Sequence, residues 1–398
     1  MRVKQVRGLE VLDSRGMPTV KVSMRVDDAP GAFFVPAGAS TGKAEVPELR
    51  DGGARFGGRG VRKAVALVEE VGRRLPRMPF ADQGEFDGLL HELNLPGNVS
   101  LGLSGAFAHA AAAAKGVPLY AYFGTSRTLP CPMVNLFSGG LHGGGNMPIQ
   151  DILVMPIRYR TFAEALEKVW RTYQAARTLV GKRYDYLPNW VADEGGFAPK
   201  FRSVEEALKL AVESIEEAGL KPGRDMAITL DVAASHGAGI TIARLEKWAS
   251  GFPILSIEDG VPEDDWTAWK DLTRRLGRKV QLVGDDFFAT NPARLGRGIL
   301  ERCANAVLVK MNQIGTITRT LEVIRMAQQA GYGTVVSARS GETEDATMAD
   351  LAVGTGAGQI KIGSIARSER GAKYNRLLEI EAELSAARPV AHERAKRR

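Results

Sequence analysis

The stretch VQLVGDDFFATNPARLGRGILERCANAVLVKMN, residues 280–312, contains two short apolar runs, and charged residues stand at the end of each run. A segment of helical length separates the two runs. Near-continuous apolar strands that alternate with helices are typical of a parallel sheet that is buried on both faces. This stretch therefore predicts a strand–helix–strand unit of an α/β fold.

The same rhythm recurs between residues 227 and 364. The apolar runs are AITLDV (227–232), PILSIED (253–259), VQLVGDD (280–286), AVLVKMN (306–312), GTVVSAR (333–339) and QIKIGS (359–364). Each has a charged residue at or near its C-terminal end, and these residues follow one another at intervals of 27, 27, 25, 29 and 22: Asp231, Glu258, Asp285, Lys310, Arg339 and Lys361. In a β/α barrel the C-terminal ends of the strands meet at one mouth, so we expect these side chains to share a pocket. A Rossmann fold is the structural alternative, but no predicted strand leads into a GxGxxG helix start.

The N-terminal part has a different pattern. Extended runs at residues 6–12, 19–26 and 31–36 are separated by turns, which predicts a β-meander, and three helical stretches follow at 61–75, 84–93 and 104–116. We expect an α+β domain over residues 1–129, a β/α barrel over 130–387 and a basic C-terminal tail over 388–398.

Composition excludes several classes of function. The net charge is +7, but the tail RPVAHERAKRR holds five Arg or Lys against one Glu and so supplies +4 of it. No basic stripe interleaved with aromatic residues occurs elsewhere, so we expect no nucleic-acid partner. Nowhere do 18 apolar residues run together, and the charged start lacks the pattern of a signal peptide, so we expect a cytoplasmic protein without a membrane partner. The modest positive charge suits a small anionic substrate.

The residues at the strand ends suggest a reaction. Asp231, Glu258 and Asp285 form an all-oxygen set of the kind that Mg²⁺ prefers. Lys310 and Lys361 follow on later strands, and a lysine can act as a general base only when its pKa falls, which a nearby divalent ion and a second ammonium both favour. A metal, a lysine base and carboxylates together fit proton abstraction α to a carboxylate.

Several longer motifs carry a family resemblance. They are DSRGMPTV (13–20), VPAGASTG (35–42), VADEGGFAPK (191–200), SIED (256–259), LVGDDFFATN (282–291), VLVKMNQIGT (307–316), RSGETEDAT (339–347) and GQIKIGS (358–364). On these motifs the chain resembles the enolase (phosphopyruvate hydratase) family from end to end. The resemblance implies an enolase-type barrel after the N-terminal domain, a Mg²⁺-dependent hydro-lyase activity and a homodimer or higher homo-oligomer.

The resemblance also implies roles for individual residues. Asp231, Glu258 and Asp285 match the metal ligands, and Ser40 matches the ligand of a second Mg²⁺ that binds with the substrate. Lys310 matches the proton acceptor, and Glu194 matches the acid that helps hydroxide to leave, with Asp151 and Lys361 as further catalytic positions. The positions that hold the phosphate and the carboxylate of 2-phosphoglycerate match His142, Gln150, Arg339, Ser340 and Lys361.

The chain departs from the family pattern at four places. Ala338 stands where enolases carry a histidine, and Asp151 stands where glutamate, one methylene longer, is usual. His236 replaces a usual glutamate ahead of a shortened segment, and Gly260 follows SIED where proline is usual. These changes spare the metal ligands and the lysine pair.

Three functions follow as expectations. The first is dehydration of 2-phosphoglycerate or a similar phosphate to an enolpyruvate. The second is a specialised synthase of carboxyphosphonoenolpyruvate in phosphonate biosynthesis, whose substrate would fill the space beside Ala338. The third is a catalytically silent binding protein, against which the intact Lys310 and Glu194 argue.

Overall fold

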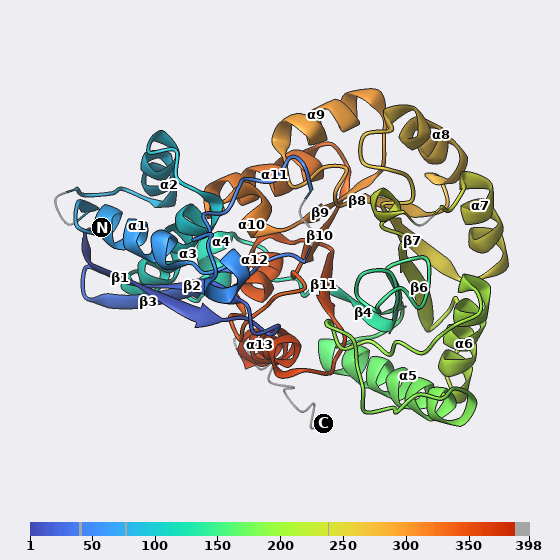
Figure 1. Cartoon of the computed structure of the whole chain (residues 1–398). Helices are drawn as coiled ribbons and strands as arrows, with labels where there is room; N and C mark the ends of the chain where they lie inside the picture. Colours follow the sequence, from blue (N-terminus) through green and yellow to red (C-terminus); the bar gives the residue numbers. More distant parts are fainter. Residues whose placement is uncertain (40–41, 76–77, 238, 387–398) are drawn as a thin grey trace, which may run out of the picture.

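The computed structural model describes residues 1–39, 42–75, 78–237 and 239–386. An N-terminal α+β part lies beside a closed β/α barrel (Figure 1). The first barrel strand begins at Cys131, and we propose residues 129 and 130 as the boundary between the two domains. The basic tail over 388–398 lies outside the described residues.

The N-terminal part confirms the predicted meander and helices. Its sheet is antiparallel in the order β1 (Val3–Leu12), β2 (Pro18–Val26) and β3 (Ala29–Phe34). The helical elements are η1 (Arg55–Gly58), α1 (Arg62–Gly72), α2 (Gln83–Glu92), α3 (Gly97–Ala114) and α4 (Leu119–Phe123). Helix α3 lies very close to the sheet: a Cβ added to Gly31 would stand 2.3 Å from the backbone nitrogen of Ala110. This position therefore requires glycine.

The strands of the described barrel close in the order β10-β11-β4-β5-β6-β7-β8-β9. Their bounds are β4 (Cys131–Ser138), β5 (Asp151–Pro156), β6 (Met226–Asp231), β7 (Ile254–Glu258), β8 (Gln281–Gly284), β9 (Ala306–Val309), β10 (Gly333–Ser337) and β11 (Gln359–Gly363). The six predicted runs form β6 to β11, and β4 and β5 complete the barrel.

The six predicted runs pair in parallel as expected, but β5, which was not among them, runs in the opposite direction. Strand β5 pairs antiparallel with both β4 and β6. Residues 139–150 connect β4 to β5 without a crossover helix, and a direct connection of this kind joins antiparallel neighbours. Consequently Asp151, the first residue of β5, lies opposite Asp231, the last residue of β6.

Side-chain alternation along the strands places the polar ends inside the barrel. An inner apolar cluster includes Val283 of β8 and Leu308 of β9. Asp285 and Lys310 lie two residues beyond them, and residues i and i+2 of a strand face the same side. The apolar cluster thus fills one end of the barrel interior and the charged groups occupy the other.

Helices surround the barrel strands (Figure 1). They are α5 (Phe162–Arg183), α6 (Val204–Glu217), α7 (Ile242–Gly251), α8 (Trp266–Leu276), α9 (Pro292–Glu301), α10 (Met311–Ile314), α11 (Ile317–Gln329), α12 (Thr347–Thr355) and α13 (Ser368–Ala386), with the short η3 (Ala234–His236) after β6. Trp248 of α7 and Trp269 of α8 are fully buried against the sheet, and Trp269 stacks on Phe287 with ring centroids 4.2 Å apart. Within the described ranges, no helix combines the length and apolar character needed to cross a bilayer.

Candidate active site

One polar cavity opens at the charged end of the barrel. Most of the residues predicted for the site line it, and they come from strands and loops far apart in the sequence: His142, Gln150, Glu194, Asp231, Asp285, Lys310, Arg339, Ser340 and Lys361. Glu258 and Asp151 lie directly behind this wall, in contact with Lys361 and His142. Ser40 lies outside the described residues.

Lys361 joins two of the predicted metal ligands. Its Nζ lies 2.6 Å from Asp231 Oδ2 and 2.6 Å from Glu258 Oε2, and all three side chains are buried. Burial and the neighbouring charge of Asp231 raise the pKa of Glu258 well above its ordinary value. Burial alone would lower the pKa of Lys361, but the charges of Asp231 and Glu258 outweigh it and raise this pKa.

Lys310 is paired with the third predicted ligand. Its Nζ donates to Asp285 Oδ2 at 2.5 Å, and the side chains of Lys310 and Asp285 are only 13% and 12% exposed. Burial would lower the pKa of Lys310, yet the Asp285 carboxylate outweighs it and the pKa is raised. Lys361 does act to lower the pKa of Lys310, as expected, but the charge of Asp285 outweighs it, so the expected net fall in this pKa is not seen.

Arg339 and Ser340 follow β10 and connect the barrel to the N-terminal domain. The Arg339 side chain is buried, and its Nη1 donates to Glu45 Oε2 at 3.0 Å and to Asn312 Oδ1 at 2.9 Å. Ser340 Oγ accepts from the backbone nitrogen of Ala39 at 2.7 Å. A cationic group and a hydroxyl thus lie together on one wall of the cavity, the combination that binds phosphate oxygens.

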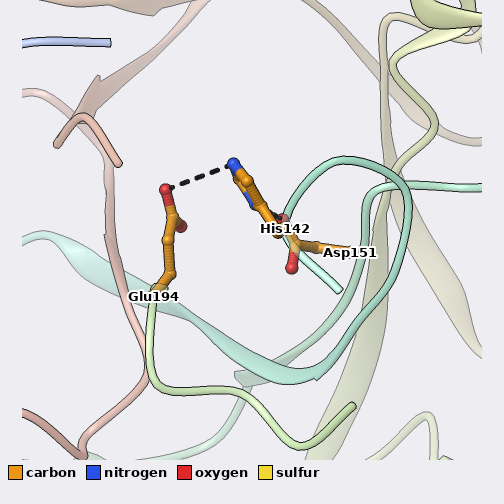
Figure 2. A group of neighbouring side chains, drawn as sticks. All are labelled: His142, Asp151 and Glu194. Carbon is orange, nitrogen blue, oxygen red and sulfur yellow. Dashed lines mark hydrogen bonds and ion pairs between the residues drawn. The ribbon is translucent and has the colours of Figure 1, made fainter. Parts of the chain in front are cut away.

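His142, Asp151 and Glu194 form a row on another wall (Figure 2). His142 Nδ1 lies 2.9 Å from Asp151 Oδ2, and His142 Nε2 lies 3.8 Å from Glu194 Oε1. The other oxygen of Asp151 accepts from Ser138 Oγ at 2.7 Å, and Glu194 Oε2 accepts from Asn135 Nδ2 at 3.2 Å. Both carboxylates are therefore held by neighbours on two sides.

Charge governs the protonation of this row. Burial would lower the pKa of His142, but Glu194 and Asp151 outweigh it and raise this pKa to about 9. Burial would raise the pKa of Glu194, but His142 and Arg370 outweigh it and lower this pKa. Asp151, which is fully buried, has its pKa raised mainly by burial. The charges in this row therefore favour the imidazolium form of His142 and the ionised form of Glu194.

Two of the four departures from the family pattern, Ala338 and His236, lie on the cavity wall. Ala338 is 7% exposed and lines the same cavity as Arg339 and Lys361. His236 also lines it, with Nε2 3.2 Å from Asp286 Oδ2.

Gln150 donates through Nε2 to Asp231 Oδ2 at 3.1 Å, which links the loop before β5 to the predicted metal ligands.

Comparison with known proteins agrees with this geometry. Residues 3–123 match the family model "Enolase, N-terminal domain", and residues 126–238 and 240–398 match "Enolase, C-terminal TIM barrel domain". The chain is also 46% identical over 410 residues to a protein named "Enolase" from Acidothermus cellulolyticus, an alignment that covers 97% of this chain and 95% of the relative. The chain belongs to the enolase family. It is accordingly a hydro-lyase of the phosphopyruvate hydratase type.

Two residues of this enolase-family site were missed by the sequence analysis. Asp259 has a left-handed backbone with φ of 43°, and its carboxylate accepts from the backbone nitrogens of Asp285 at 3.0 Å and Asp286 at 2.8 Å. Glu45 holds Arg339 across a sequence separation of 294 residues. The SIED motif contained a signal for Asp259, whereas only the contact itself identifies Glu45.

Two buried or half-buried arginines also support the enolase-family site. The fully buried Arg370 donates from Nη1 to the carbonyl oxygens of Arg339 at 2.7 Å and Ile362 at 2.9 Å, and from Nη2 to Ser340 at 2.8 Å. Arg15, in the DSRG motif, donates from Nη2 to the Ala37 carbonyl oxygen at 3.1 Å. The first fixes the turn that carries Arg339, and the second holds the segment leading to Ser40.

The donor set fits the Mg²⁺ that enolases use. Asp231, Glu258 and Asp285 supply buried carboxylate oxygens. Burial, together with the charge of Asp231, raises the pKa of Glu258, and a bound divalent cation would relieve both effects. In the part of the chain that the structure describes, the carboxylate oxygens of Asp231, Glu258 and Asp285 do not all lie within 4.8 Å of one another. A carboxylate group that meets this distance consists of Asp259, Asp285 and Asp286. Lys361 contacts the carboxylates of Asp231 and Glu258, and Lys310 contacts that of Asp285.

Proposed function

We propose that the chain catalyses the Mg²⁺-dependent, reversible dehydration of 2-phosphoglycerate to phosphoenolpyruvate. The observation that carries the proposal is that a lysine, a paired histidine and carboxylate, and an arginine–serine pair line one cavity: Lys310, His142 with Glu194, and Arg339 with Ser340. A base, a group that assists the leaving hydroxide and a phosphate site are the three functions that this elimination requires. The family assignment supports the same reaction.

Lys310 is the proposed base. The Asp285 carboxylate raises the pKa of Lys310, and a Mg²⁺ ion held by Asp285 would offset the charge of this carboxylate and favour the neutral amine. In that form, Nζ takes the proton from the carbon next to the substrate carboxylate. Its hydrogen bond to Asp285 fixes the direction of the amine within the cavity. Lys361 and Gln150, which both contact Asp231, are placed to bind the substrate carboxylate.

Asp231, Glu258 and Asp285 would hold a Mg²⁺ ion. When bound, this ion supplies positive charge beside the carboxylate as a second negative charge develops there. A second ion, with Ser40 as one ligand, remains part of the proposal on the strength of the family resemblance alone.

On the opposite side of the cavity, Arg339 and Ser340 would bind the phosphate. Glu194 and His142 would face the hydroxyl that leaves. Asp151, predicted as a catalytic residue, acts through His142 because its two oxygens are taken up by His142 and Ser138.

The two alternative functions, a catalytically silent binding protein and a phosphonate-pathway synthase, are less well supported. A catalytically silent binding protein was a wrong expectation, because the chain belongs to a family of hydro-lyases and keeps Lys310 and Glu194 in the cavity. The comparisons lend no support to a carboxyphosphonoenolpyruvate synthase in phosphonate biosynthesis. Ala338 presents only a methyl group on the cavity wall, so activity on 2-phosphoglycerate should be compared with activity on a bulkier analogue.

A substrate panel tests the proposal. The purified chain with Mg²⁺ is given 2-phosphoglycerate, or an analogue that carries a phosphonoformyl group, and enolpyruvate formation is followed by ultraviolet absorbance. We expect turnover of 2-phosphoglycerate that ends when a chelator removes Mg²⁺. Turnover of the analogue alone would overturn the proposed substrate, and turnover of neither would overturn the proposed function.

Assembly and location remain proposals as well. We infer a homodimer or higher homo-oligomer acting in the cytoplasm on a small phosphate substrate, as family membership suggests. Sedimentation of the purified chain measures the assembly directly.

A further inference from the structure

Helix α13 presents a buried polar face to the active-site end of the barrel. Arg370 and Lys373 are 0% exposed and Tyr374 is 4% exposed. They stand at positions i, i+3 and i+4 of the helix, so their side chains lie on one face. Each donates to backbone carbonyl oxygens of the segments that follow β10 and β11. None of the three is among the described residues that line the cavity, so the helix contacts the site from behind its wall.

The guanidinium of Arg370 joins the ends of two neighbouring strands, β10 and β11. Its Nη1 donates to the carbonyl oxygens of Arg339 at 2.7 Å and Ile362 at 2.9 Å, and its Nη2 donates to that of Ser340 at 2.8 Å. Arg339 and Ser340 are the proposed phosphate-binding residues, and Ile362 follows Lys361, which is proposed to bind the substrate carboxylate. A guanidinium holds its donors in a rigid planar fork. One rigid group therefore sets the spacing between the two segments.

The turn after β10 has a second attachment to α13. Lys373 Nζ donates to the Thr343 carbonyl oxygen at 2.5 Å and lies 3.0 Å from Glu342 Oε2. Glu342 Oε1 accepts from the backbone nitrogen of Arg339 at 2.9 Å. Lys373 and Glu342 thus fix the backbone that carries the arginine on the phosphate side.

The end of β11 is attached to the same helix. Tyr374 Oη donates to the Gly363 carbonyl oxygen at 2.8 Å. Gly363 has a φ of 112°, and a Cβ added there would stand 3.0 Å from Arg370 Cδ and 2.9 Å from the Glu194 carbonyl oxygen. The arginine stem passes so close to the strand end that this position requires glycine. Lys361, two residues earlier, is therefore carried by a segment with little freedom to move relative to α13.

Burying two cations is a costly way to attach a helix. A buried charge must be offset by hydrogen bonds, and replacing a buried ion pair by apolar groups of similar size often costs no stability. Apolar contacts are non-directional, so an apolar face of α13 could hold the helix in place but could not fix carbonyl oxygens at set positions. The polar face is therefore better suited to positioning than to stability.

We propose that the polar face of α13, and Arg370 above all, fixes the span between the phosphate-binding turn and Lys361, and that this span selects acids with a phosphate ester on the carbon next to the carboxylate. This inference rests on the proposed function and deepens it. Arg370 is a positioning residue, because it acts through the backbone of Arg339, Ser340 and Ile362. A ligand that reaches both anion sites binds far more tightly than either group alone, but only when its span matches theirs.

Two isomeric ligands test the inference by binding alone. 2-Phospholactate carries its phosphate on the carbon next to the carboxylate, and 3-phosphooxypropanoate carries it one carbon further away. Neither has the hydroxyl that would leave, so calorimetry with Mg²⁺ can measure both dissociation constants. For the unsubstituted chain we expect 2-phospholactate to bind about a hundredfold more tightly than its isomer, the loss typical of a misplacement of about 1 Å. Equal binding of the two isomers would overturn the proposal.

Two variants test the role of α13. Arg370→Lys keeps the charge but replaces the planar fork by a single ammonium. We expect the preference for 2-phospholactate to fall about tenfold in this variant, whereas the affinity for inorganic phosphate, which needs only one site, should change less than about threefold. Tyr374→Phe removes only the hydrogen bond to Gly363 and should lower the preference about threefold. An unchanged preference in both folded variants would contradict the positioning role.

Arg376→Lys is the matched control. Arg376 belongs to the same helix but pairs with Asp350 at 2.9 Å, so the preference should stay as in the unsubstituted chain. Circular dichroism melting identifies a variant that does not fold, and Tyr374→Phe and the unsubstituted chain then decide the question. If 2-phospholactate does not bind and 2-phosphoglycerate is not turned over, the proposed function fails together with this inference. If 2-phosphoglycerate is turned over but the isomers bind equally, only this inference fails.

Discussion

Replacing Glu45 by glutamine tests how the arginine on the phosphate side is held. Glu45 accepts from Arg339 Nη1 at 3.0 Å and from Nη2 at 3.3 Å, and the two side chains are only 7% and 4% exposed. Glutamine keeps the size but turns one oxygen into an NH₂ group, which cannot accept from a guanidinium that only donates. Breaking a buried ion pair costs about 3–5 kcal/mol. Because one amide oxygen remains, we expect the free energy of unfolding to fall by about 3 kcal/mol, the lower end of that range.

Phosphate should compensate for this loss if Arg339 is the phosphate site. Without the competing charge of Glu45, we expect inorganic phosphate to bind about tenfold more tightly to the variant, which corresponds to about 1.4 kcal/mol. At a phosphate concentration about 100 times the Kd, binding to the folded state adds about 2.7 kcal/mol of stability. The variant should then recover most of what the substitution removed.

The assay is urea unfolding followed by circular dichroism, with phosphate or with sodium chloride at equal ionic strength. Glu213→Gln is the control, because Glu213 pairs with Arg183 at the surface, where such pairs contribute about 1 kcal/mol or less. A loss below about 1 kcal/mol in Glu45→Gln would show that the buried pair does not hold Arg339 as described. Equal stabilisation of the variant and the unsubstituted chain by phosphate would show that the anion binds elsewhere.

Three further outcomes are expected. Lys310→Met should lower kcat by about a hundredfold or more, as expected for loss of a general base, while calorimetry still detects 2-phosphoglycerate binding; near-normal turnover would remove Lys310 from the mechanism. Ala338→His should raise the ratio of kcat/KM for 2-phosphoglycerate over its phosphonoformyl analogue, because the imidazole fills space on the cavity wall, and a lower ratio would contradict this use of the space. Glu10→Gln should cost about 1 kcal/mol at pH 7, as for an exposed or half-exposed ion pair. The hydrogen bond from Arg55 lowers the pKa of Glu10 from 4.5 to about 2, so this difference is present above pH 4.5 and is lost as the pH falls toward 2; a difference that persists at pH 2 in urea titrations would contradict it.

The alternation of side chains along each strand, which repeats every two residues, made it possible to predict which charged residues face the barrel interior. An apolar residue such as Val283 faces the barrel interior, and the charged residue two positions later faces the same side, so the strand ends could be located from the sequence. The same reasoning applies to Leu308 and Lys310. Their convergence at one mouth then follows from barrel geometry.

The features that escaped prediction depend on contacts between distant segments. Strand β5 was not among the predicted runs, so neither its antiparallel direction nor the contact of Asp151 with His142 could be predicted from the strand pattern. Arg370 contacts carbonyl oxygens about thirty residues away, as its 2.8 Å contact with Ser340 at a separation of 30 shows. The pKa of Lys310 depended on which of several neighbouring charges comes closest, and spacing along the chain does not determine this.

Exchange of the hydrogen on carbon 2 tests the central claim most directly, namely that Lys310 removes a proton next to the substrate carboxylate inside this cavity. The measurement is proton NMR of 2-phosphoglycerate in deuterated water with Mg²⁺ and either the unsubstituted chain or Lys310→Met. We expect the unsubstituted chain to introduce deuterium at carbon 2 and Lys310→Met not to do so. Deuterium uptake at equal rates with both proteins would contradict it.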